Sequence, residues 1–500
     1  MNLTIDPWIP VIGADDRKRL ISLNNLFAEA NEIRDFSVKP HEKVALLRLL
    51  ICITQAALDG PADFDAWEIC RPIIQSAVKG YLEKWQASFE LFGDGPRFLQ
   101  VPGLKTSKED GEGNPATKLD LTLATGNNAS LFDNAAGNAR AVGTGRLALT
   151  LLAFQCFSPC GRIGVAKWNG TDTPGKGSSN HAPCTPSSML HTYLQGSTLL
   201  ETIHLNLLNK DEASDFGTKF WGCPTWELPV LSIDNNQAIT NATRSYLGRL
   251  VPLSRAIRLD AEGKQMILAN GLDYPLAPLF REPAATLVQR DEDSVVLGAT
   301  LGRSIWRQLS SITVKRRSNK DTISGPLALK NCDGTQAYSL WTGALVAAGN
   351  GKIEDVVEAC YDVPAGMFRD EGRKVYEEGV ALANLWQYAA SKSVKAYSET
   401  MKLEPVPYER ARNHFWTAIE QYVPILLRIA DKPGELGDIK VSEWGKQVKE
   451  AALAAYDFAC PRQTPRQIQA YAIGLQQLFL QKPKDPNSPT KKKATAKKKS

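Results

Sequence analysis

Apolar residues recur at helical spacing in three stretches of the first third of the chain. Residues 41–58, 65–91 and 146–157 each carry apolar side chains three or four positions apart, and we predict a helix over each of them. Pro159 follows the third stretch, and proline ends helices because it lacks an amide hydrogen and clashes with the preceding turn. Apolar faces of this kind are typical of a buried core.

Shorter apolar stretches predict strands. We expect a strand over residues 3–12, which hold one Trp and two Pro, and another over residues 97–101, after the break FGDGP at 92–96. Residues 104–128 are polar and glycine-rich, so we expect a long loop there. Residues 301–317 are expected to form a helix and a strand.

Two further patterns predict β-hairpins. Residues 256–260 and 265–269 read as paired strands, and Lys264 stands at the mouth of that hairpin. A second strand pattern covers residues 341–346 and precedes an Asn-Gly dipeptide, which favours tight turns. Asn350 is therefore expected to project at the tip of a second hairpin.

From about residue 367 the pattern is almost entirely helical. Four helices are expected, near residues 370–400, 407–430, 439–459 and 464–481. The fourth begins with Thr464-Pro465-Arg466-Gln467, which is typical of a capping box with Pro at the first helical position. The fold class is therefore α+β. We expect an irregular mixed domain over 1–365, a four-helix bundle over 366–481 and a basic disordered tail over 482–500.

Composition narrows the choice of class. The chain has 500 residues, of which 43% are hydrophobic and 23% charged, as in a globular protein of two or three domains. Residues 482–500 contain eight Lys and one Asp and so carry a charge of +7. Because the net charge of the whole chain is +5, the remaining residues carry −2. A basic surface on the folded part must therefore be local. The nine cysteines show no disulfide framework, and no apolar run spans a bilayer, so we expect a cytoplasmic protein.

The stretch SPCGRIGVAKWN at 158–169 is the first candidate for chemistry. Gly161 and Gly164 lie beside Lys167, and glycines let the backbone of a loop approach a ligand closely. A second candidate is Leu131-Phe132-Asp133-Asn134, where Phe132 could stack on a base and Asn134 could donate hydrogen bonds. Each is equally typical of an ordinary surface loop.

Catalytic motifs are scarce. Cys156, Cys160, His181 and Cys184 have a spacing that could bind zinc, which leaves a metal-dependent nucleic-acid hydrolase open as an alternative. The sequence contains no HExxH, no phosphate loop ending in GKS or GKT, no GxSxG and only five His. These absences favour a non-catalytic binding subunit, and a purely structural scaffold is a further alternative.

Taken together, the sequence resembles the large subunit of the type I-E Cascade complex, the CasA family of CRISPR surveillance proteins. The matching stretches run in order through nearly the whole chain. They are LTIDPWIPV at 3–11, FELFGDGPRFLQV at 89–101, LFDN at 131–134, the glycine loop at 159–167, QGSTLLETIHLNLL at 195–208, YLGRLVPL at 246–253, KQMILANGL at 264–272 and the terminal helices.

The resemblance implies roles for particular residues. Three elements would read the protospacer-adjacent motif (PAM) and open the duplex: a glycine loop, a lysine finger and a wedge hairpin. A flexible loop would contact the guide RNA. The residues at matching positions are Gly161, Arg162, Ile163 and Gly164 for the loop, Lys264 for the finger, Gly349, Asn350 and Gly351 for the wedge, and Phe132, Asp133 and Asn134 for RNA. Where the family usually carries Gln at the wedge, this chain offers Asn350 or Lys352.

The resemblance also implies an activity and partners. A protein of this kind would be a non-catalytic subunit that recognises the PAM, promotes R-loop formation and recruits the helicase-nuclease for antiviral defence. Its partners would be the other Cascade subunits, CRISPR RNA, target double-stranded DNA and that nuclease, with no cofactor and no membrane. Sequence specificity would be delegated to guide pairing.

Overall fold

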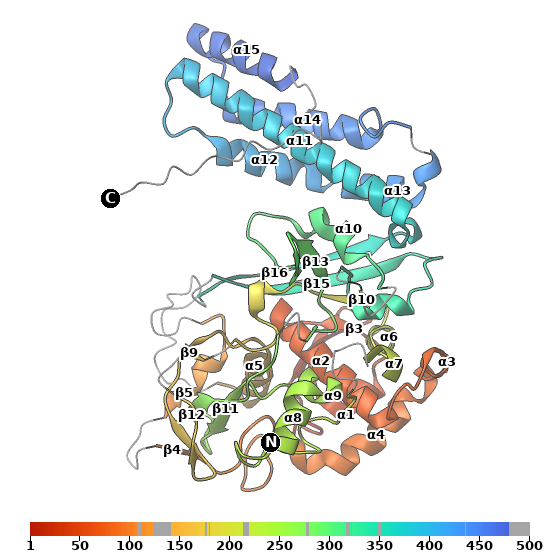
Figure 1. The fold of residues 1–500 in the computed structure, drawn as a ribbon, viewed down its shortest axis with the longest axis vertical. Coiled ribbons are helices and arrows are strands. Elements are labelled where there is room, and N and C mark those ends of the chain that lie inside the picture. Colours follow the sequence, from red (N-terminus) through yellow and green to blue (C-terminus); the bar gives the residue numbers. More distant parts are fainter. Residues whose placement is uncertain are drawn as a thin grey trace. The chain divides into compact units, whose positions relative to one another are not determined.

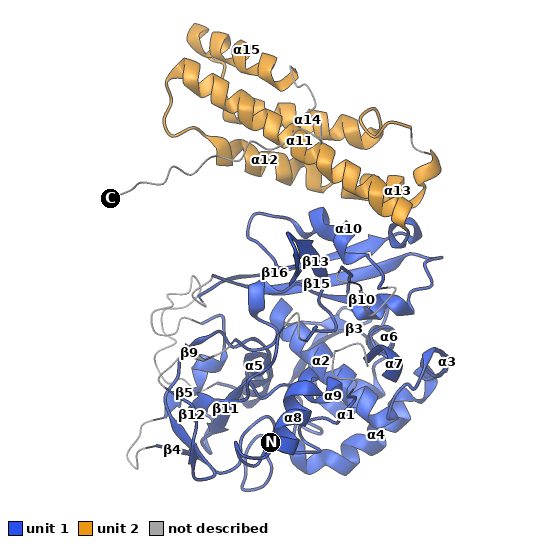
Figure 2. Ribbon diagram, viewed as in Figure 1, with its two compact units in different colours: residues 1–369 blue, residues 370–500 orange. Residues whose placement is uncertain are grey.

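The computed structural model describes residues 1–107, 113–123, 142–175, 178–179, 181–213, 220–276, 280–316, 321, 323–348, 352–435 and 437–479. The chain divides into two compact units, Met1–Arg369 and Asp370–Ser500 (Figure 2). Unit 1 mixes helices and small sheets, whereas the described part of unit 2 is helical (Figure 1). Among the described residues, no helix has the length and apolar character needed to cross a membrane.

Helix α2, Pro40–Leu58, is the central helix of unit 1. Its first sixteen residues are buried, and it contacts α4, α5 and α9. Glu42 starts it, because a Glu42 carboxylate oxygen accepts the amide hydrogen of Lys39 at 3.0 Å. The other helices of unit 1 are α1 (Leu23–Ala28), α3 (Phe64–Ile69), α4 (Ile74–Trp85), α5 (Thr144–Phe157), α6 (Leu199–Leu205), α7 (Lys210–Ala213), α8 (Asn236–Arg244), α9 (Tyr246–Leu250) and α10 (Leu309–Ile312).

The strands of unit 1 form small antiparallel sheets. Their orders are β2-β1-β3, β10-β15-β16, β11-β12-β5, β4-β7-β8, β13-β14 and β6-β9. The bounds are β1 Ile9–Gly13, β2 Lys18–Ile21, β3 Ile33–Phe36, β4 Leu104–Thr106, β5 Asn114–Pro115, β6 Gly161–Arg162, β7 Ala166–Trp168, β8 Thr171–Asp172, β9 Ser178–Ser179, β10 His191–Gln195, β11 Arg255–Leu259, β12 Gln265–Asn270, β13 Leu287–Arg290, β14 Asp293–Val296, β15 Tyr338–Ala347 and β16 Ile353–Val363.

Several predictions for unit 1 differ from the structure in detail. Within the expected strand 3–12, β1 begins only at Ile9, and the described part of the expected loop 104–128 contains β4 and β5. The helix expected over 65–91 is divided into α3 and α4, because Pro72 sits in a short 3-10 helix, Arg71–Ile73, between them. Residues 97–101 form no strand, although the amide of Val101 donates to the carbonyl of Ile257 at 2.9 Å. Residues 305–312 form a 3-10 helix followed by α10, and no strand follows in the described part of 301–317.

Unit 2 contains five α-helices among the described residues. They are α11 (Asp370–Met401), α12 (Tyr408–Glu420), α13 (Val423–Asp431), α14 (Glu443–Ala459) and α15 (Pro465–Phe479). The helix expected over 407–430 is therefore divided, and Pro424 lies in the first turn of α13. The capping box of α15 is confirmed, since the amide of Gln467 donates to the Thr464 hydroxyl and the Gln467 side chain accepts from the amide of Thr464.

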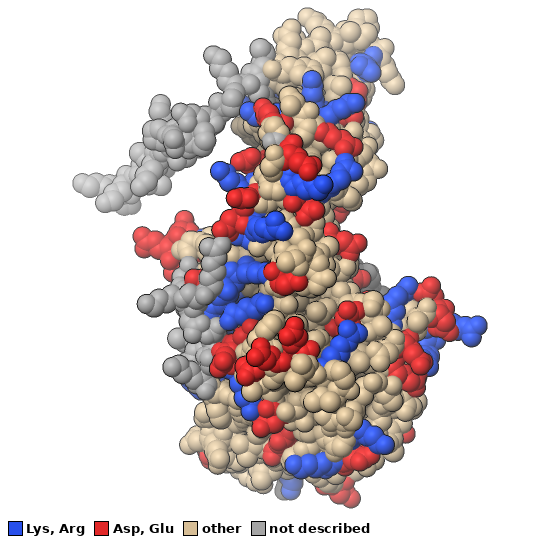
Figure 3. All heavy atoms as spheres, turned by 90° about the vertical axis from the view of Figure 1, so that its right-hand side faces the viewer, with Lys and Arg blue, Asp and Glu red and all other residues tan. Residues whose placement is uncertain are grey.

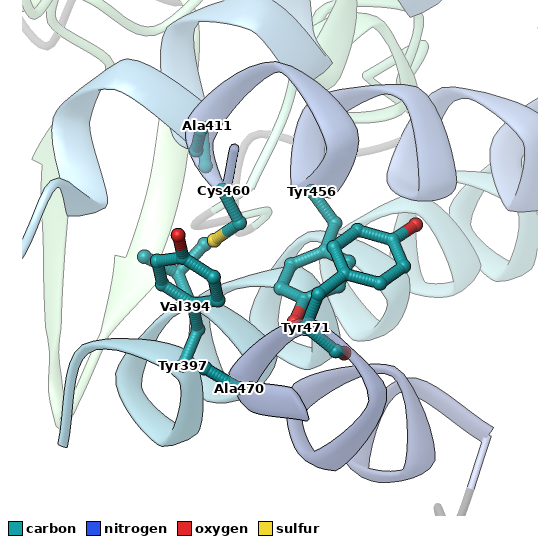
Figure 4. Packing of buried hydrophobic residues seen from close by; sticks show 8 residues of the cluster. Val394, Tyr397, Ala411, Tyr456, Cys460, Ala470 and Tyr471 are labelled. Carbon is teal, nitrogen blue, oxygen red and sulfur yellow. The ribbon is translucent and has the colours of Figure 1, made fainter. Parts of the chain in front are cut away.

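The core of unit 2 is rich in tyrosine. Tyr397, Tyr456 and Tyr471 pack with smaller residues of four helices and of the turn after α14 (Figure 4). Tyr456 and Tyr471 stack with their ring centroids 4.9 Å apart, and the Tyr456 hydroxyl donates to the carbonyl of Tyr471 at 2.9 Å. The Tyr471 hydroxyl in turn donates to the Asp457 carboxylate of α14, so both rings align α14 with α15.

Candidate nucleic-acid interface

The glycine loop follows the end of α5. Gly161 and Arg162 form β6, which pairs antiparallel with β9. Neither Gly161 nor Gly164 has a φ in the left-handed region, and a Cβ added at either position would meet no atom within 4 Å. Neither backbone conformation nor packing therefore requires glycine here. What the two glycines provide is open space over the main chain, which a close-approaching ligand could use.

Two side chains from distant parts of the sequence hold this loop. The Arg255 guanidinium donates through Nη2 to the carbonyl of Pro159 at 2.8 Å. The amide of Cys160 donates to Nδ1 of His181 at 3.2 Å, so His181 must be neutral at that nitrogen. Burial, followed by the nearby charge of Arg255, lowers the pKa of His181 and favours that neutral form. Burial also lowers the pKa of Arg255 to about 10, which leaves it a cation at neutral pH.

Lys264 lies at the tip of a hairpin, as predicted. β11 and β12 pair from Arg255 opposite Asn270 to Leu259 opposite Met266. The turn between them contains Gly263 at φ +68°, and the amide of Lys264 donates to the Asp260 carboxylate at 2.9 Å. A carbonyl of the same residue accepts from Ala116 at 2.9 Å, so the backbone of the tip is fixed on both sides.

The ammonium group of Lys264 already has a partner. It pairs with the Glu262 carboxylate at 2.7 Å, and both side chains are more than half exposed. The hydrogen bond and the charge of Glu262 raise the pKa of Lys264, while those of Lys264 lower the pKa of Glu262. An exposed ion pair of this kind is weak, so the Lys264 ammonium can leave Glu262 and pair with an anionic ligand instead.

The structure brings the glycine loop and the Lys264 hairpin together. Arg255 begins β11 and contacts Pro159, while its cross-strand partner Asn270 donates through Nδ2 to the carbonyl of Pro174 at 2.8 Å. Figure 1 shows β4, β5, β9, β11 and β12 gathered on one side of unit 1. Two stretches about one hundred positions apart in sequence thus belong to one local structure.

The second predicted hairpin is confirmed as β15 and β16. The amide of Ala348 donates to the carbonyl of Lys352 at 2.8 Å, which closes the hairpin below its tip. Ser188 braces the same end: its hydroxyl accepts from the amide of Ala347 at 2.9 Å and donates to the carbonyl of Ala347 at 3.2 Å. The predicted wedge residues Gly349, Asn350 and Gly351 lie outside the described residues.

The candidate RNA-binding residues Phe132, Asp133 and Asn134 also lie outside the described residues. Shortly after this segment, where the described residues resume at 142, Arg146 pairs with Glu42 at 2.6 Å and with Asp120 at 2.7 Å. Burial alone would raise the pKa of Asp120, but the hydrogen bond and charge of Arg146 outweigh it and hold that pKa well below its usual range. Asp120 and Arg146 also line a cavity of about 200 Å³ with Thr117 and Leu123.

The zinc-site hypothesis is wrong for the residues that it named. Cys156, Cys160, His181 and Cys184 are all described, and within the described ranges no three His, Cys, Asp or Glu side chains could hold a metal ion. Cys156 and Cys184 are buried, joined by a backbone hydrogen bond of 3.1 Å. Nδ1 of His181 is occupied by the amide of Cys160.

Sequence reasoning missed the residues that connect the loops. Arg255 occurs in the strand RAIRL, where its position signals only a buried cation, and it contacts a carbonyl 96 residues away. His181, a candidate metal ligand by its spacing, accepts a hydrogen bond from the backbone of Cys160. Ser188 adopts φ +53°, and no local pattern pointed to its contact with Ala347. Long-range contacts of single polar side chains leave no periodic signature.

Fold and site together define a class: a two-unit α+β protein whose candidate binding residues lie on loops and hairpins. Comparison with known proteins is more specific. The profile of the family described as CRISPR-associated protein Cse1 matches residues 2–455, and the chain belongs to this family.

Individual relatives agree with that assignment. The CRISPR-associated protein CasA/Cse1 of Thermus thermophilus is 28% identical over 408 residues, which cover 76% of this chain and 74% of the relative. The solved structure of Thermus thermophilus CasA (Cse1) superposes with a TM-score of 0.75 at 21% identity, over 96% of this chain and 98% of that one. A chain in a structure described as a CRISPR RNA-guided surveillance complex gives a TM-score of 0.73 at 18% identity, over 96% and 99%.

Proposed function

We propose that this chain is the large, non-catalytic subunit of a type I-E Cascade complex, which recognises the PAM in target duplex DNA. It then promotes strand opening and R-loop formation, and recruits the helicase-nuclease. The observation that carries the proposal is the junction of the glycine loop with the Lys264 hairpin through Arg255 and Asn270. A loop with open space over Gly161 and Gly164, joined to the base of a hairpin that carries an exposed lysine at its tip, suits the narrow minor groove.

Recognition of this kind would use few contacts, and the shape of the groove would restrict which duplexes can make them. The minor groove presents a degenerate pattern of acceptors, so backbone atoms of Gly161–Gly164 and one ammonium group would accept several short motifs. Guide pairing would supply the sequence specificity. The proposed order of events needs a binding step at the loop and the finger before any strand is separated.

Strand opening is assigned to the β15–β16 hairpin. Its tip, with Asn350 or Lys352 as the inserted residue, would offset the unstacking of about a few kcal/mol per base step. The Ser188 brace and the Ala348–Lys352 hydrogen bond support this role, because a wedge must be stiff at its base. Phe132, Asp133 and Asn134 are proposed to contact the guide RNA, and helices α11 to α15 to form a four-helix bundle with α12 and α13 as its divided second helix.

Lys264→Ala tests the proposal. In the complex assembled with its guide RNA and partner subunits, we expect about tenfold weaker binding of motif-bearing duplex, a loss of on the order of 1–2 kcal/mol. Lys79→Ala, which removes an exposed lysine of α4, is the matched control and should leave this affinity unchanged. Assembly on the guide RNA should be normal for both.

Equal affinity of the Lys264→Ala and control complexes for motif DNA would reject the proposed reader. A complex that assembles but does not footprint the motif would point instead to a purely structural scaffold.

A further inference from the structure

Arg255 joins two elements that the proposed function uses separately. We propose that Arg255 is a positioning residue that fixes the Lys264 hairpin against the glycine loop, so that the two contact DNA as one unit. The inference rests on the proposed function and adds to it a residue that does not touch the DNA. It is carried by the hydrogen bonds around the Arg255 guanidinium.

The first step is the guanidinium itself. Nη1 donates to the carbonyl of Ser254 at 2.7 Å and Nη2 to the carbonyl of Pro159 at 2.8 Å. The residue is 3% exposed, so these carbonyls replace water around the charge. One planar group with a fixed fork of donors thus bonds the start of β11 and the start of the loop at the same time.

The second step is the backbone of Arg255. The amide of Arg255 donates to the Gln155 side-chain oxygen at 2.9 Å, and the Gln155 side-chain amide donates to the carbonyl of Arg255 at 2.9 Å. Gln155 belongs to α5, the helix that leads into the glycine loop. The hydroxyls of Ser158 and Ser254 lie 3.2 Å apart and add a further link between the same two segments. The base of the hairpin is therefore attached to the helix end as well as to the loop.

The third step is the other strand. Asn270 pairs with Arg255 across the hairpin and donates to the carbonyl of Pro174, beyond the far end of the loop region. Both strands of the hairpin are thus anchored at their base to the segment 159–175. Five residues of strand at about 3.3 Å each separate this base from the turn, so a tilt of about 10° at the base would move Lys264 by roughly 3 Å.

Arg97, from outside the hairpin, provides a contrast because it bonds the other end of β11. Its guanidinium donates to the carbonyl of Leu259 at 2.9 Å and to that of Gly93 at 2.6 Å. Arg97 therefore holds the far end of β11 and bonds Gly93 rather than the glycine loop. Loss of Arg97 removes an arginine that bonds the hairpin but leaves the Pro159 contact in place, which makes Arg97→Met the matched control for Arg255→Met.

The test is a double-mutant cycle in the assembled complex. Arg255→Met is combined with Lys264→Ala, and affinity is measured for motif-bearing and motif-lacking duplexes. We expect Arg255→Met to weaken binding of the motif-bearing duplex about tenfold and to leave the other duplex unchanged. In the Arg255→Met background, Lys264→Ala should then reduce affinity by less than about twofold, because a misplaced lysine contributes little.

Independent, multiplying effects of the two substitutions would overturn the inference, and so would an Arg97→Met complex with the same defect. If Lys264→Ala alone has no effect on motif DNA, the proposed function fails first. If Arg255→Met does not assemble, Arg255→Lys and Asn270→Ala carry the same cycle. Arg255→Lys retains the charge but not the two-donor fork, so full rescue by lysine would also reject positioning by the guanidinium.

Discussion

Gly161 and Gly164 differ from the glycines that shape the fold. An added Cβ would meet nothing at either of them, whereas at Gly298 it would lie 1.9 Å from the carbonyl oxygen of Ser187. The fold does not explain the two loop glycines, and the proposed function does, because they leave room for DNA to approach the backbone. Gly298, by contrast, is required by the close packing of the chain against Ser187.

Gly161→Ala should separate binding from stability. We expect the free energy of unfolding to change by less than about 0.5 kcal/mol, as for a surface substitution without strain, while binding of motif duplex weakens. Gly298→Ala should show the opposite pattern, with clear destabilisation. Thermal unfolding and duplex titration of both variants check this. Normal DNA binding by Gly161→Ala would mean that nothing approaches the loop at that point.

His181 makes the hold on the loop dependent on pH. Its pKa is lowered from 6.5 in the folded chain, so the neutral form is favoured there. The stabilisation is complete above pH 6.5 and is lost as the pH falls from 6.5 through the lowered pKa, since a protonated Nδ1 cannot accept from Cys160.

We therefore expect the affinity for motif duplex to fall between pH 7.5 and 5.5 in the unaltered protein, and to fall less in His181→Gln, whose side-chain oxygen still accepts. Identical pH profiles of the two proteins would show that His181 does not control the loop. Duplex titrations at a fixed salt concentration are the measurement, because ionic strength alters DNA affinity independently.

At the scale of elements, the sequence predicts those helices and hairpins whose formation depends on residues close together in the chain. The helices α2 and α5, the hairpins β11–β12 and β15–β16 and the capping box of α15 follow from periodicity and turn chemistry. The helices expected over 65–91 and 407–430 are each divided at a proline, Pro72 and Pro424. Residues 97–101 lie against β11 without forming a regular ladder, which no single-segment pattern distinguishes from a strand.

The candidate site was predictable in parts but not as an arrangement. Lys264 was placed at its tip from the strand pattern, and the glycine loop from the end of α5. The contact of Arg255 with Pro159 depends on tertiary packing, which the sequence alone does not encode in any local period. The side chains that join elements were therefore missed, although the elements themselves were found.

The brace at the β15–β16 hairpin can be tested with two neighbouring serines. Ser187 and Ser188 both have positive φ, +56° and +53°, but the described contact to Ala347 belongs to Ser188. Ser188→Gly should slow strand opening, followed by fluorescence of a base analogue next to the motif, while initial capture is unchanged. Ser187→Gly relieves the same backbone strain and should leave both steps as they are. Equal rates of strand opening in the two variants would show that the Ser188 contact with Ala347 does not support the hairpin.

At the scale of the whole molecule, the chain outside the basic C-terminal residues carries little net charge. On the face drawn in Figure 3, Lys and Arg side chains alternate with Asp and Glu over both units. With a net charge of −2 outside residues 482–500, general attraction to DNA is weak for the folded part. Recognition must then come from a few defined contacts, which agrees with a reader built from one loop and two hairpins.

The chain forms two compact units, so we expect a substitution in the core of one unit to destabilise that unit alone. A Cβ at Gly474 would lie 2.0 Å from the Tyr456 hydroxyl, and Gly474→Ala should destabilise unit 2 by about 1–3 kcal/mol. Gly437→Ala, where a Cβ meets nothing, is the control in the same unit. Calorimetry should show part of the unfolding profile shifting. A uniform shift of the whole profile would contradict independent cores.

The pairing of Lys264 with Glu262 has a consequence for how such a protein would search a genome. A lysine that carries its own counter-charge gains little from random phosphates, because it only exchanges one anion for another. Ordinary duplex would hold the protein briefly, and scanning would stay fast. Under the proposed function, only a groove that binds the glycine loop at the same time would make the transfer of Lys264 from Glu262 to DNA favourable.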